Sequence, residues 1–531
     1  MLFFKTDMIF QVYHCYWMNT ILKLYARQYY IHKTVNDKII PHVLKNYIIL
    51  KVYTWKEYTH GRNKYDMPVN SFENYPMTWK PVLDKNSSKP IYIMLSDLLK
   101  EDILNGILTP GTKLPPQREL ADYLDINLST VTRAFKLCEQ RGLICSVMGS
   151  GTFVSSDAAT QGMLVIHDAQ EKTIEMGAIL PNPDISEIAT DYLKQMTKDP
   201  DFYKLLQYAS TDYDELQVKA AKRWLGYLKI DSDKEHIAFS TGSQNGIFSV
   251  LASLFKEGDK IATTEVTYPG LKMAAKILGI QVVPMPYYEG KLTRKSLEYV
   301  DKNYNISGFY FIPDFNNPSG ERMDLETRKM IAAYCEEKHR PFLEDGIYTL
   351  FQPDPLPPIS HFSKQYGIFI ASVSKIMSPG LRLAVLHIPG EFRKPVADTL
   401  YAMEITPPAL MMQLFTRLVN SGKFDRIREL RIAELVERNR LFDEICGDCV
   451  TEGNTYSPIR WLKLREDDQR VPARFEQEMR EKGVRIYSAE RFVVGNAAVP
   501  KAVRVSLISE HDPEKYERGL RLLKESYYFS E

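Results

Sequence analysis

Six short apolar runs recur through the C-terminal two thirds of the chain, with longer helical patterns between them. The runs are residues 237–240, 260–264, 281–284, 308–312, 341–345 and 368–372. Helices are expected in the gaps, for example over 245–255 and 325–338. Short buried strands that alternate with helices predict a mostly parallel sheet covered on both faces. Such a sheet binds ligands in the crevice at the carboxyl ends of its strands.

Polar side chains stand where several of these runs end. Ser243 and Gln244 belong to a Thr-Gly-Ser-Gln loop that opens a helix, and its N–H groups and hydroxyls suit a phosphate. Asp345 can keep a pyridine nitrogen protonated, Lys375 can form a Schiff base, and Arg382 can clamp a phosphate dianion. These are the groups that pyridoxal 5'-phosphate (PLP) requires.

Together, these motifs resemble those of the fold-type I PLP enzymes, the aminotransferase class I/II group. The matching pieces keep the family order: Thr241-Gly-Ser-Gln244, Glu265-Val-Thr-Tyr268-Pro-Gly270, Asn316-Asn317-Pro-Ser-Gly320, Asp345-Gly-Ile-Tyr348 and Ser372-x-Ser-Lys375 with Arg382. The resemblance implies an α/β PLP-binding effector domain over residues 173–531. A lone lysine after a strand is usually structural, and it is the set of motifs that favours a cofactor lysine here.

The same resemblance implies a role for each matching side chain. Lys375 would form the internal aldimine, Asp345 would bind the ring nitrogen, and Asn317 with Tyr348 would bind the phenolic oxygen. The remaining cofactor contacts would come from Ser243, Gln244, Ser372 and Arg382 at the phosphate and Tyr268 stacked on the ring. Arg504 is similar to the strand arginine that grips a substrate or effector carboxylate, although an arginine in a strand can also simply pair with an acid.

Tyr208 matches a tyrosine that reaches the phosphate of the partner subunit, which implies a homodimer. Three positions depart from the family pattern. Asp212 stands where glycine is common, Leu216-Gln217 stands where Leu-Arg is common, and Ala384 replaces the glycine of a frequent Arg-Leu-Gly. None of these departures removes a group that binds PLP. They leave open whether turnover or domain closure is impaired.

A smaller unit precedes this domain, over about residues 80–155. Apolar residues recur at helical spacing from Pro90 to Leu104, and a second short helix is expected over 117–123. Asn127 or Ser129 can cap a third helix. Two short helices and a tight turn predict a helix-turn-helix whose second helix can enter a major groove. Short strands at 143–145 and 151–154 would add a wing, which gives an α+β winged helix-turn-helix.

Three blocks of this unit resemble the winged helix-turn-helix of the GntR family. They are Leu114-Pro-Pro-Gln-Arg118-Glu-Leu-Ala121, Asn127-Leu-Ser-Thr130-Val-Thr-Arg133-Ala134 and Gly149-Ser-Gly-Thr-Phe-Val154. The resemblance implies that the side chains facing DNA are Arg118, Thr130, Thr132 and Arg133, with the wing tip from Gly149 to Gly151 along the backbone or minor groove. Arg118 is expected at phosphate and the recognition helix at base edges. Taken singly, each of these polar residues would be an ordinary solvated helix position.

A GntR-like reader ahead of an aminotransferase-like domain resembles the MocR (GabR-like) regulators. This implies a dimeric transcription regulator that binds operator half-sites in double-stranded DNA. A small amine or amino-acid effector would displace Lys375 from PLP and shift a conformational equilibrium. PLP itself could instead be the signal. The alternative is an active aminotransferase, of aromatic or 2-aminoadipate type, whose DNA-binding module is vestigial.

Residues 1–76 differ from the rest of the chain. They hold ten Lys and Arg against five Asp and Glu, and ten of the 32 tyrosines. One interpretation is a basic aromatic arm that adds nucleic-acid affinity. The favoured one is an atypical extension that is not native, with the native start near Met67 or Met77. Residues 156–172 are expected to be a linker.

Composition excludes some other classes. The formal net charge is +1, so any DNA contact needs a local basic patch. The cysteines are too few for a disulfide scaffold, and Cys446 and Cys449 form a C-x-x-C that is read as two ordinary thiols with no metal. No run of about 18 apolar residues occurs. The expected location is the bacterial cytosol, at the nucleoid.

Overall fold

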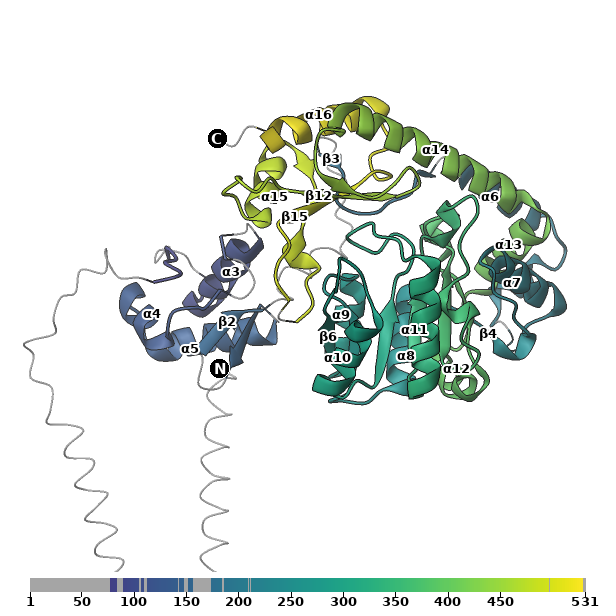
Figure 1. The fold of residues 1–531 in the computed structure, drawn as a ribbon, viewed down its shortest axis with the longest axis horizontal. Coiled ribbons are helices and arrows are strands. Elements are labelled where there is room, and N and C mark those ends of the chain that lie inside the picture. The colour runs from purple at the N-terminus through teal and green to yellow at the C-terminus, as the bar shows by residue number, and fades with distance from the viewer. Residues whose placement is uncertain are drawn as a thin grey trace, which may run out of the picture. The chain divides into compact units, whose positions relative to one another are not determined.

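The computed structural model describes residues 77–83, 89–104, 107–108, 112–141, 143–147, 151–155, 173–183, 186–208, 210, 212–495 and 497–528. Figure 1 shows their helices and strands. The expected N-terminal extension and the expected linker lie outside the described residues, and so does Gly149 of the expected wing tip.

The described residues between 77 and 155 form helices that pack on a small hairpin. The elements are α3 (Ile91–Leu104), α4 (Gln117–Leu124), α5 (Leu128–Gln140), β1 (Ile144–Val147) and β2 (Gly151–Val154). The two strands pair antiparallel, with Val147 opposite Gly151. Leu99, Leu120 and Phe135 meet in the core of this unit, which also contains Trp79. The Trp79 indole donates a hydrogen bond of 2.7 Å to Asp102, so the ordered unit includes residues just after Met77.

A seven-stranded sheet forms the centre of the second folded region. Its order is β4 (Ile237–Ser240), β10 (Ala384–His387), β9 (Gly367–Ser372), β8 (Phe342–Asp345), β7 (Gly308–Phe311), β5 (Lys260–Thr264) and β6 (Gln281–Met285). All six runs expected from the sequence are strands, and the pairs among β6, β5, β7, β8 and β9 are parallel. The mostly parallel sheet is therefore confirmed. β10 is a strand that the sequence pattern did not predict, and it pairs antiparallel with both β4 and β9.

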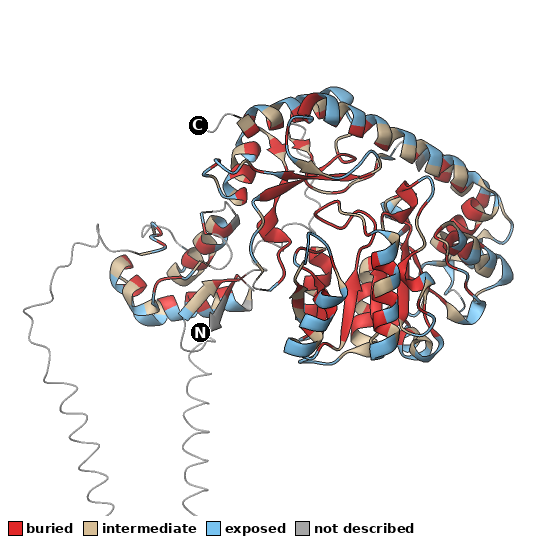
Figure 2. Cartoon of the chain, viewed as in Figure 1, coloured by how far each residue is buried: buried red, intermediate tan, exposed pale blue. Residues whose placement is uncertain are grey.

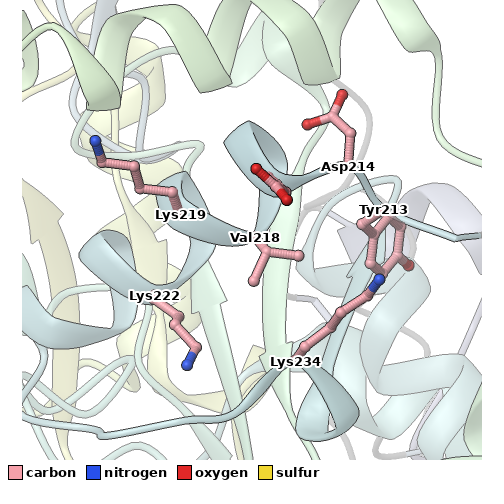
Figure 3. A pocket seen from close by; sticks show the side chains of 7 residues that line it. Tyr213, Asp214, Val218, Lys219, Lys222 and Lys234 are labelled. Carbon is pink, nitrogen blue, oxygen red and sulfur yellow. The ribbon is translucent and has the colours of Figure 1, made fainter.

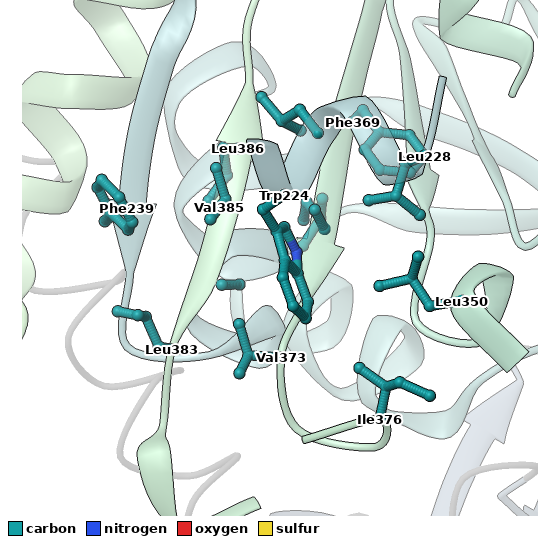
Figure 4. Close-up of a cluster of buried hydrophobic side chains, with 14 of the residues drawn as sticks. Trp224, Leu228, Phe239, Leu350, Phe369, Val373, Ile376, Leu383, Val385 and Leu386 are labelled. Carbon is teal, nitrogen blue, oxygen red and sulfur yellow. The ribbon is translucent and has the colours of Figure 1, made fainter. Parts of the chain in front are cut away.

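Alternate residues of these strands pack into two separate hydrophobic clusters. Ile261, Tyr310 and Leu343 belong to one cluster, whereas their neighbours Ala262 and Phe309 belong to the other. The first cluster continues through Trp224 and Val385 (Figure 4). Figure 2 shows the strands of the sheet coloured as buried. Burial on both faces explains why these strands appear in the sequence as continuous apolar runs.

Helices cover this sheet or flank it in the region up to residue 446. They are α6 (Ser186–Met196), α7 (Glu215–Tyr227), α8 (Ser243–Leu254), α9 (Pro269–Ile277), α10 (Arg294–Tyr304), α11 (Leu325–Lys338), α12 (Gly390–Glu404), α13 (Ala409–Asn420) and α14 (Lys423–Cys446). The prediction for α11 is confirmed at both ends. In the part of the chain that the structure describes, no helix is long and apolar enough to cross a membrane.

A second sheet lies near the C-terminal end of the chain. Its order is β11 (Thr451–Glu452), β12 (Ile459–Lys463), β15 (Ala502–Ser506) and β14 (Tyr487–Ser488), with α15 (Pro472–Glu481) and α16 (Pro513–Tyr528) beside it. The segment that follows the expected linker joins this part of the fold. There, β3 (Ile174–Glu175) pairs in parallel with β13 (Val484–Arg485). Cys446 and Cys449 are buried here as free thiols. Among the described residues, no group of three or more His, Cys, Asp or Glu is placed to hold a metal ion.

Candidate functional site

The loop between β4 and α8 forms an anion cradle. Gly242 precedes α8 with φ of 86°, a conformation that favours glycine. A Cβ at this position would lie 2.7 Å from Nη2 of Arg382, so the guanidinium closely covers the glycine. The Ser243 hydroxyl is buried at the start of the helix and has no hydrogen-bond partner. A helix N-terminus with a free buried hydroxyl and an adjacent arginine suits a phosphate.

Gln244 and Tyr268 lie beside this cradle. The Gln244 side-chain amide donates to the Gly270 carbonyl at 2.9 Å, and its Oε1 is buried without a partner. A Cβ on Gly270 would lie 2.2 Å from Oε1 of Gln244 and 2.3 Å from the Tyr268 ring, so glycine is needed where the two segments meet. Burial and the nearby Asp345 carboxylate raise the pKa of Tyr268, while Arg382 and Arg504 lower it. The predicted stacking and phosphate residues therefore share one electrostatic environment.

Asp345 ends β8 inside the protein. Its Oδ2 accepts a hydrogen bond of 3.0 Å from the Tyr310 hydroxyl, and its Oδ1 accepts one of 3.2 Å from the Ile347 amide. Burial raises the pKa of Asp345 to about 6. A protonated ring nitrogen would favour the ionised form, because an opposite charge stabilises a carboxylate. Burial likewise raises the pKa of Tyr348, and the negative charge of Asp345 raises it further, while Arg504 lowers it.

Lys375 lies just after β9. Its amine donates a hydrogen bond of 2.5 Å to the Ile179 carbonyl. Burial lowers the pKa of Lys375 to about 8, and the positive charges of Arg504 and Arg382 act in the same direction. A lysine with a lowered pKa has a larger neutral fraction, and the neutral amine is the nucleophile. In the preceding turn, the Ser372 hydroxyl accepts from the Ser374 amide at 3.3 Å.

Arg504 projects from β15 and is only 2% exposed. It donates to Oδ1 of Asn317 at 2.6 Å and to the Gly177 carbonyl, while its Nε is buried without a partner. The rings of Phe492 and Tyr487 lie 4.8 Å and 5.3 Å from its guanidinium carbon. The hydrogen bonds of Arg504 therefore go to neutral groups, and the alternative of a simple pair with an acid finds no support among the described residues. Its expected role at a substrate or effector carboxylate stays a prediction.

Among the predicted cofactor residues, Tyr208 stands apart. Its side chain is 83% exposed, and its expected role requires a second subunit, so that role stays a prediction. The departures nearby have local explanations. Asp212 forms an ion pair of 2.7 Å with Lys234, and Gln217 completes a capping box with Asp214 at the start of α7.

A surface groove of about 580 Å³ lies along α7 (Figure 3). It is lined by Tyr213, Asp214, Glu215, Val218, Lys219, Lys222 and Lys234. None of the predicted cofactor residues lines it. Lys222 pairs with Asp233 and Lys234 with Asp212, so two of its lysines already have acidic partners. We do not assign the cofactor to this groove.

The helix-turn-helix presents the predicted DNA-contacting residues on its surface. Arg118 and Thr132 are exposed on α4 and α5, and Thr130 is half-buried. The Thr132 hydroxyl donates to Oε1 of Gln117 at 2.8 Å, which links the two helices. The guanidinium carbon of Arg133 lies 4.0 Å from the centre of the Tyr92 ring, a cation–π contact. Gly151 begins β2 with φ of 116°.

Three groups that contact candidate site residues were not predicted from the sequence: the Tyr310 hydroxyl and the carbonyls of Gly177 and Ile179. Tyr310 was expected only as a strand residue, although the hydroxyl of a tyrosine in a buried strand needs a hydrogen-bond partner and is a signal for one. The carbonyls of Gly177 and Ile179 carry no side-chain signal at all. They could be found only from the structure.

Both halves of the chain are similar to known families. Residues 185–523 match the model for aminotransferase class I and II, and residues 91–154 match the model for bacterial regulatory proteins of the gntR family. The chain is 42% identical over 458 residues to the uncharacterized HTH-type transcriptional regulator YdeF of Bacillus subtilis, which covers 86% of this chain and 98% of that protein.

Solved aminotransferases share the fold of the larger region. An archaeal alanine:glyoxylate aminotransferase superposes with a TM-score of 0.62 at 18% identity, covering 67% of this chain and 90% of that one. LysN, an alpha-aminoadipate aminotransferase of Thermus thermophilus, superposes with a TM-score of 0.60 at 21% identity, covering 69% of this chain and 96% of that one. At these identities the likeness shows the fold alone.

Proposed function

Because this chain belongs to the GntR-type transcription regulators that carry an aminotransferase class I and II domain, the MocR-type architecture, we propose that it controls transcription in response to PLP and an amino compound. The observation that carries the proposal is the amine of Lys375. It is buried, and Arg382 of the phosphate cradle and Arg504 both act on its pKa, in a chain that also contains a helix-turn-helix.

The residues of this region fit PLP. The buried Ser243 hydroxyl without a partner and the guanidinium over Gly242 suit its phosphate. Gln244 is next in the chain, and Ser372 at the end of β9 lies across Ala384 of β10 from Ser240 at the end of β4. Asp345 suits its ring nitrogen. Asn317 and Tyr348 would hold the phenolic oxygen, and Tyr268 the ring face. When bound, PLP supplies an aldehyde that condenses reversibly with amines.

Lys375 and Arg504 give the protein a way to respond to a ligand. Both donate to backbone carbonyls of one short segment, Lys375 to Ile179 and Arg504 to Gly177. The Ser509 hydroxyl donates to the carbonyl between them, on Ala178. An effector whose carboxylate engaged Arg504 would compete with the bond to Gly177. Such an exchange of partners would give the ligand different affinities for two states of the chain, as any ligand-driven switch requires.

Segment 177–179 connects the effector site to the DNA reader along the chain. It follows β3, which pairs with β13 near the C-terminal sheet, and the expected linker comes directly before β3. Releasing or tightening this segment would therefore act on the part of the chain that leads to the helix-turn-helix. In a homodimer, the result would be a change in how two readers engage two half-sites.

Transamination is the second candidate function. Every PLP-binding group expected from the family is present, and the fold is shared with LysN, an alpha-aminoadipate aminotransferase. The helix-turn-helix has its own core and exposes Arg118 and Arg133. It favours the regulator, because transamination does not require a DNA-binding module.

Absorbance spectroscopy on the purified chain separates the two functions. The PLP-loaded protein is titrated with a panel of amines and amino acids, and binding to its own upstream DNA is followed in parallel. A regulator is expected to show a spectral change without sustained keto-acid release, and at least one amine should alter DNA binding. Steady keto-acid production without DNA binding would contradict the proposal and support the aminotransferase.

A further inference from the structure

Leu128 is the first residue of α5, and 39% of it is exposed. The buried face of this helix contains Val131, Ala134, Phe135 and Cys138, all of which are at most 3% exposed. Single exposed leucines are common on protein surfaces and need no explanation in general. Leu128 differs because the N-terminal end of a recognition helix is the part that meets base edges.

Polar side chains around Leu128 are engaged with one another. Oδ1 of Asn127 accepts hydrogen bonds of 3.0 Å from both the amide and the hydroxyl of Ser129. One turn further along, the Thr132 hydroxyl is bonded to Gln117. Asn127 and Ser129 therefore serve the cap of the helix. Leu128, between them, offers only an apolar surface.

The chemistry of the major groove limits what an apolar side chain can recognise. Each base pair presents hydrogen-bond donors and acceptors there, and thymine alone adds a methyl group. We infer that Leu128 contacts a thymine 5-methyl group and so specifies thymine at one position of each operator half-site. This inference rests on the proposed DNA-binding function and adds a residue to those expected to read bases.

Replacing thymine by deoxyuridine tests the contact, since it removes only the methyl group. The full chain first selects its preferred duplex from a random pool. Each thymine of the selected half-site is then changed singly to deoxyuridine, and affinities are measured at one salt concentration for the wild type, Leu128→Ala and Ile107→Ala. Ile107 is a matched control, because it is an apolar residue of the same unit that is 65% exposed and lies outside the recognition helix.

We expect one thymine per half-site whose replacement weakens wild-type binding about fourfold, the value for burying one methyl group. Ile107→Ala should show the same loss, whereas Leu128→Ala should bind the two duplexes equally. Three results would overturn the inference: a selected half-site without thymine, no cost at any position, or an equal cost in Leu128→Ala. Failure to select any sequence would overturn the DNA-binding function itself, which is a distinguishable outcome.

Discussion

In the aminotransferase-like region, several candidate ligand-binding residues have buried polar atoms that lack partners, whereas on the helix-turn-helix two candidate DNA-reading residues are exposed and contact neighbouring side chains. The Ser243 hydroxyl, Oε1 of Gln244 and Nε of Arg504 belong to the first kind. Thr132, bonded to Gln117, and Arg133, stacked on Tyr92, belong to the second.

This difference reflects what each ligand must provide. A buried polar group without a partner costs about 1–3 kcal/mol, so a site that keeps several is built for a ligand that satisfies them. Exposed pairs cost little to break, because water competes for them already. On the proposed function, the cofactor region is shaped in advance for its ligand, while the expected DNA-reading side chains would exchange partners on binding.

Gly242→Ala should have the largest effect, because it disturbs the phosphate cradle of the aminotransferase-like region. The added Cβ meets the Arg382 guanidinium at 2.7 Å, and the positive φ strains any other residue. We expect a loss of about 1–3 kcal/mol in the free energy of unfolding, together with weaker PLP binding. Gly258→Ala is the matched control, since its φ is 89° and its Cβ would meet nothing within 4 Å. Equal PLP affinities in the two variants, measured by cofactor titration, would argue against the cradle.

Arg504→Lys tests whether the buried arginine reads a carboxylate. Lysine keeps the charge but loses the planar fork, so amino-acid effectors should bind about tenfold more weakly. Simple amines without a carboxylate should bind as before, which provides a control within the same protein. Isothermal titration of both ligand types makes the measurement. An equal loss for both would show that Arg504 is only structural.

Asn127→Ala tests the helix-turn-helix, because Asn127 caps its helix α5. Loss of this cap should reduce the free energy of unfolding of the helix-turn-helix by about 1 kcal/mol and weaken DNA binding. The cofactor spectrum should not change, because Asn127 belongs to the other folded region. Thermal unfolding followed by circular dichroism, with and without operator DNA, gives both values. A changed PLP affinity would contradict this separation of the two regions.

Of these substitutions, Tyr310→Phe should have the smallest effect, and we expect it as a change in the pH dependence of PLP binding. The Tyr310 hydroxyl lowers the pKa of Asp345, which burial has raised to about 6. Cofactor binding that needs the ionised carboxylate should therefore fall as pH drops through about 6. Without the hydroxyl, the pKa of Asp345 should rise and this fall should begin roughly half to one pH unit higher. Identical pH profiles for PLP binding would exclude a role for Tyr310.

The sequence predicted the elements whose residues repeat a clear pattern. All six expected strands and α11 are present, since strands buried on both faces must be apolar throughout. It did not predict β10, an antiparallel strand inserted into a parallel sheet. Lys375, Asp345 and Arg504 could be proposed because their chemistry is carried by side chains. The contacts of Gly177 and Ile179 could not, because a backbone carbonyl has no signature in the sequence.

The most direct test of the central claim is operator affinity measured by fluorescence anisotropy, for the PLP-treated wild type and Lys375→Ala, with and without the amine that changes the spectrum. Lys229→Ala, which alters a surface lysine paired with Asp354, is the control. We expect the amine to shift the affinity of the wild type and the control by at least about fivefold, a typical allosteric coupling, and to leave Lys375→Ala unchanged. An equal response in all three proteins, or none in the wild type, would contradict the claim that Lys375 couples PLP to DNA binding.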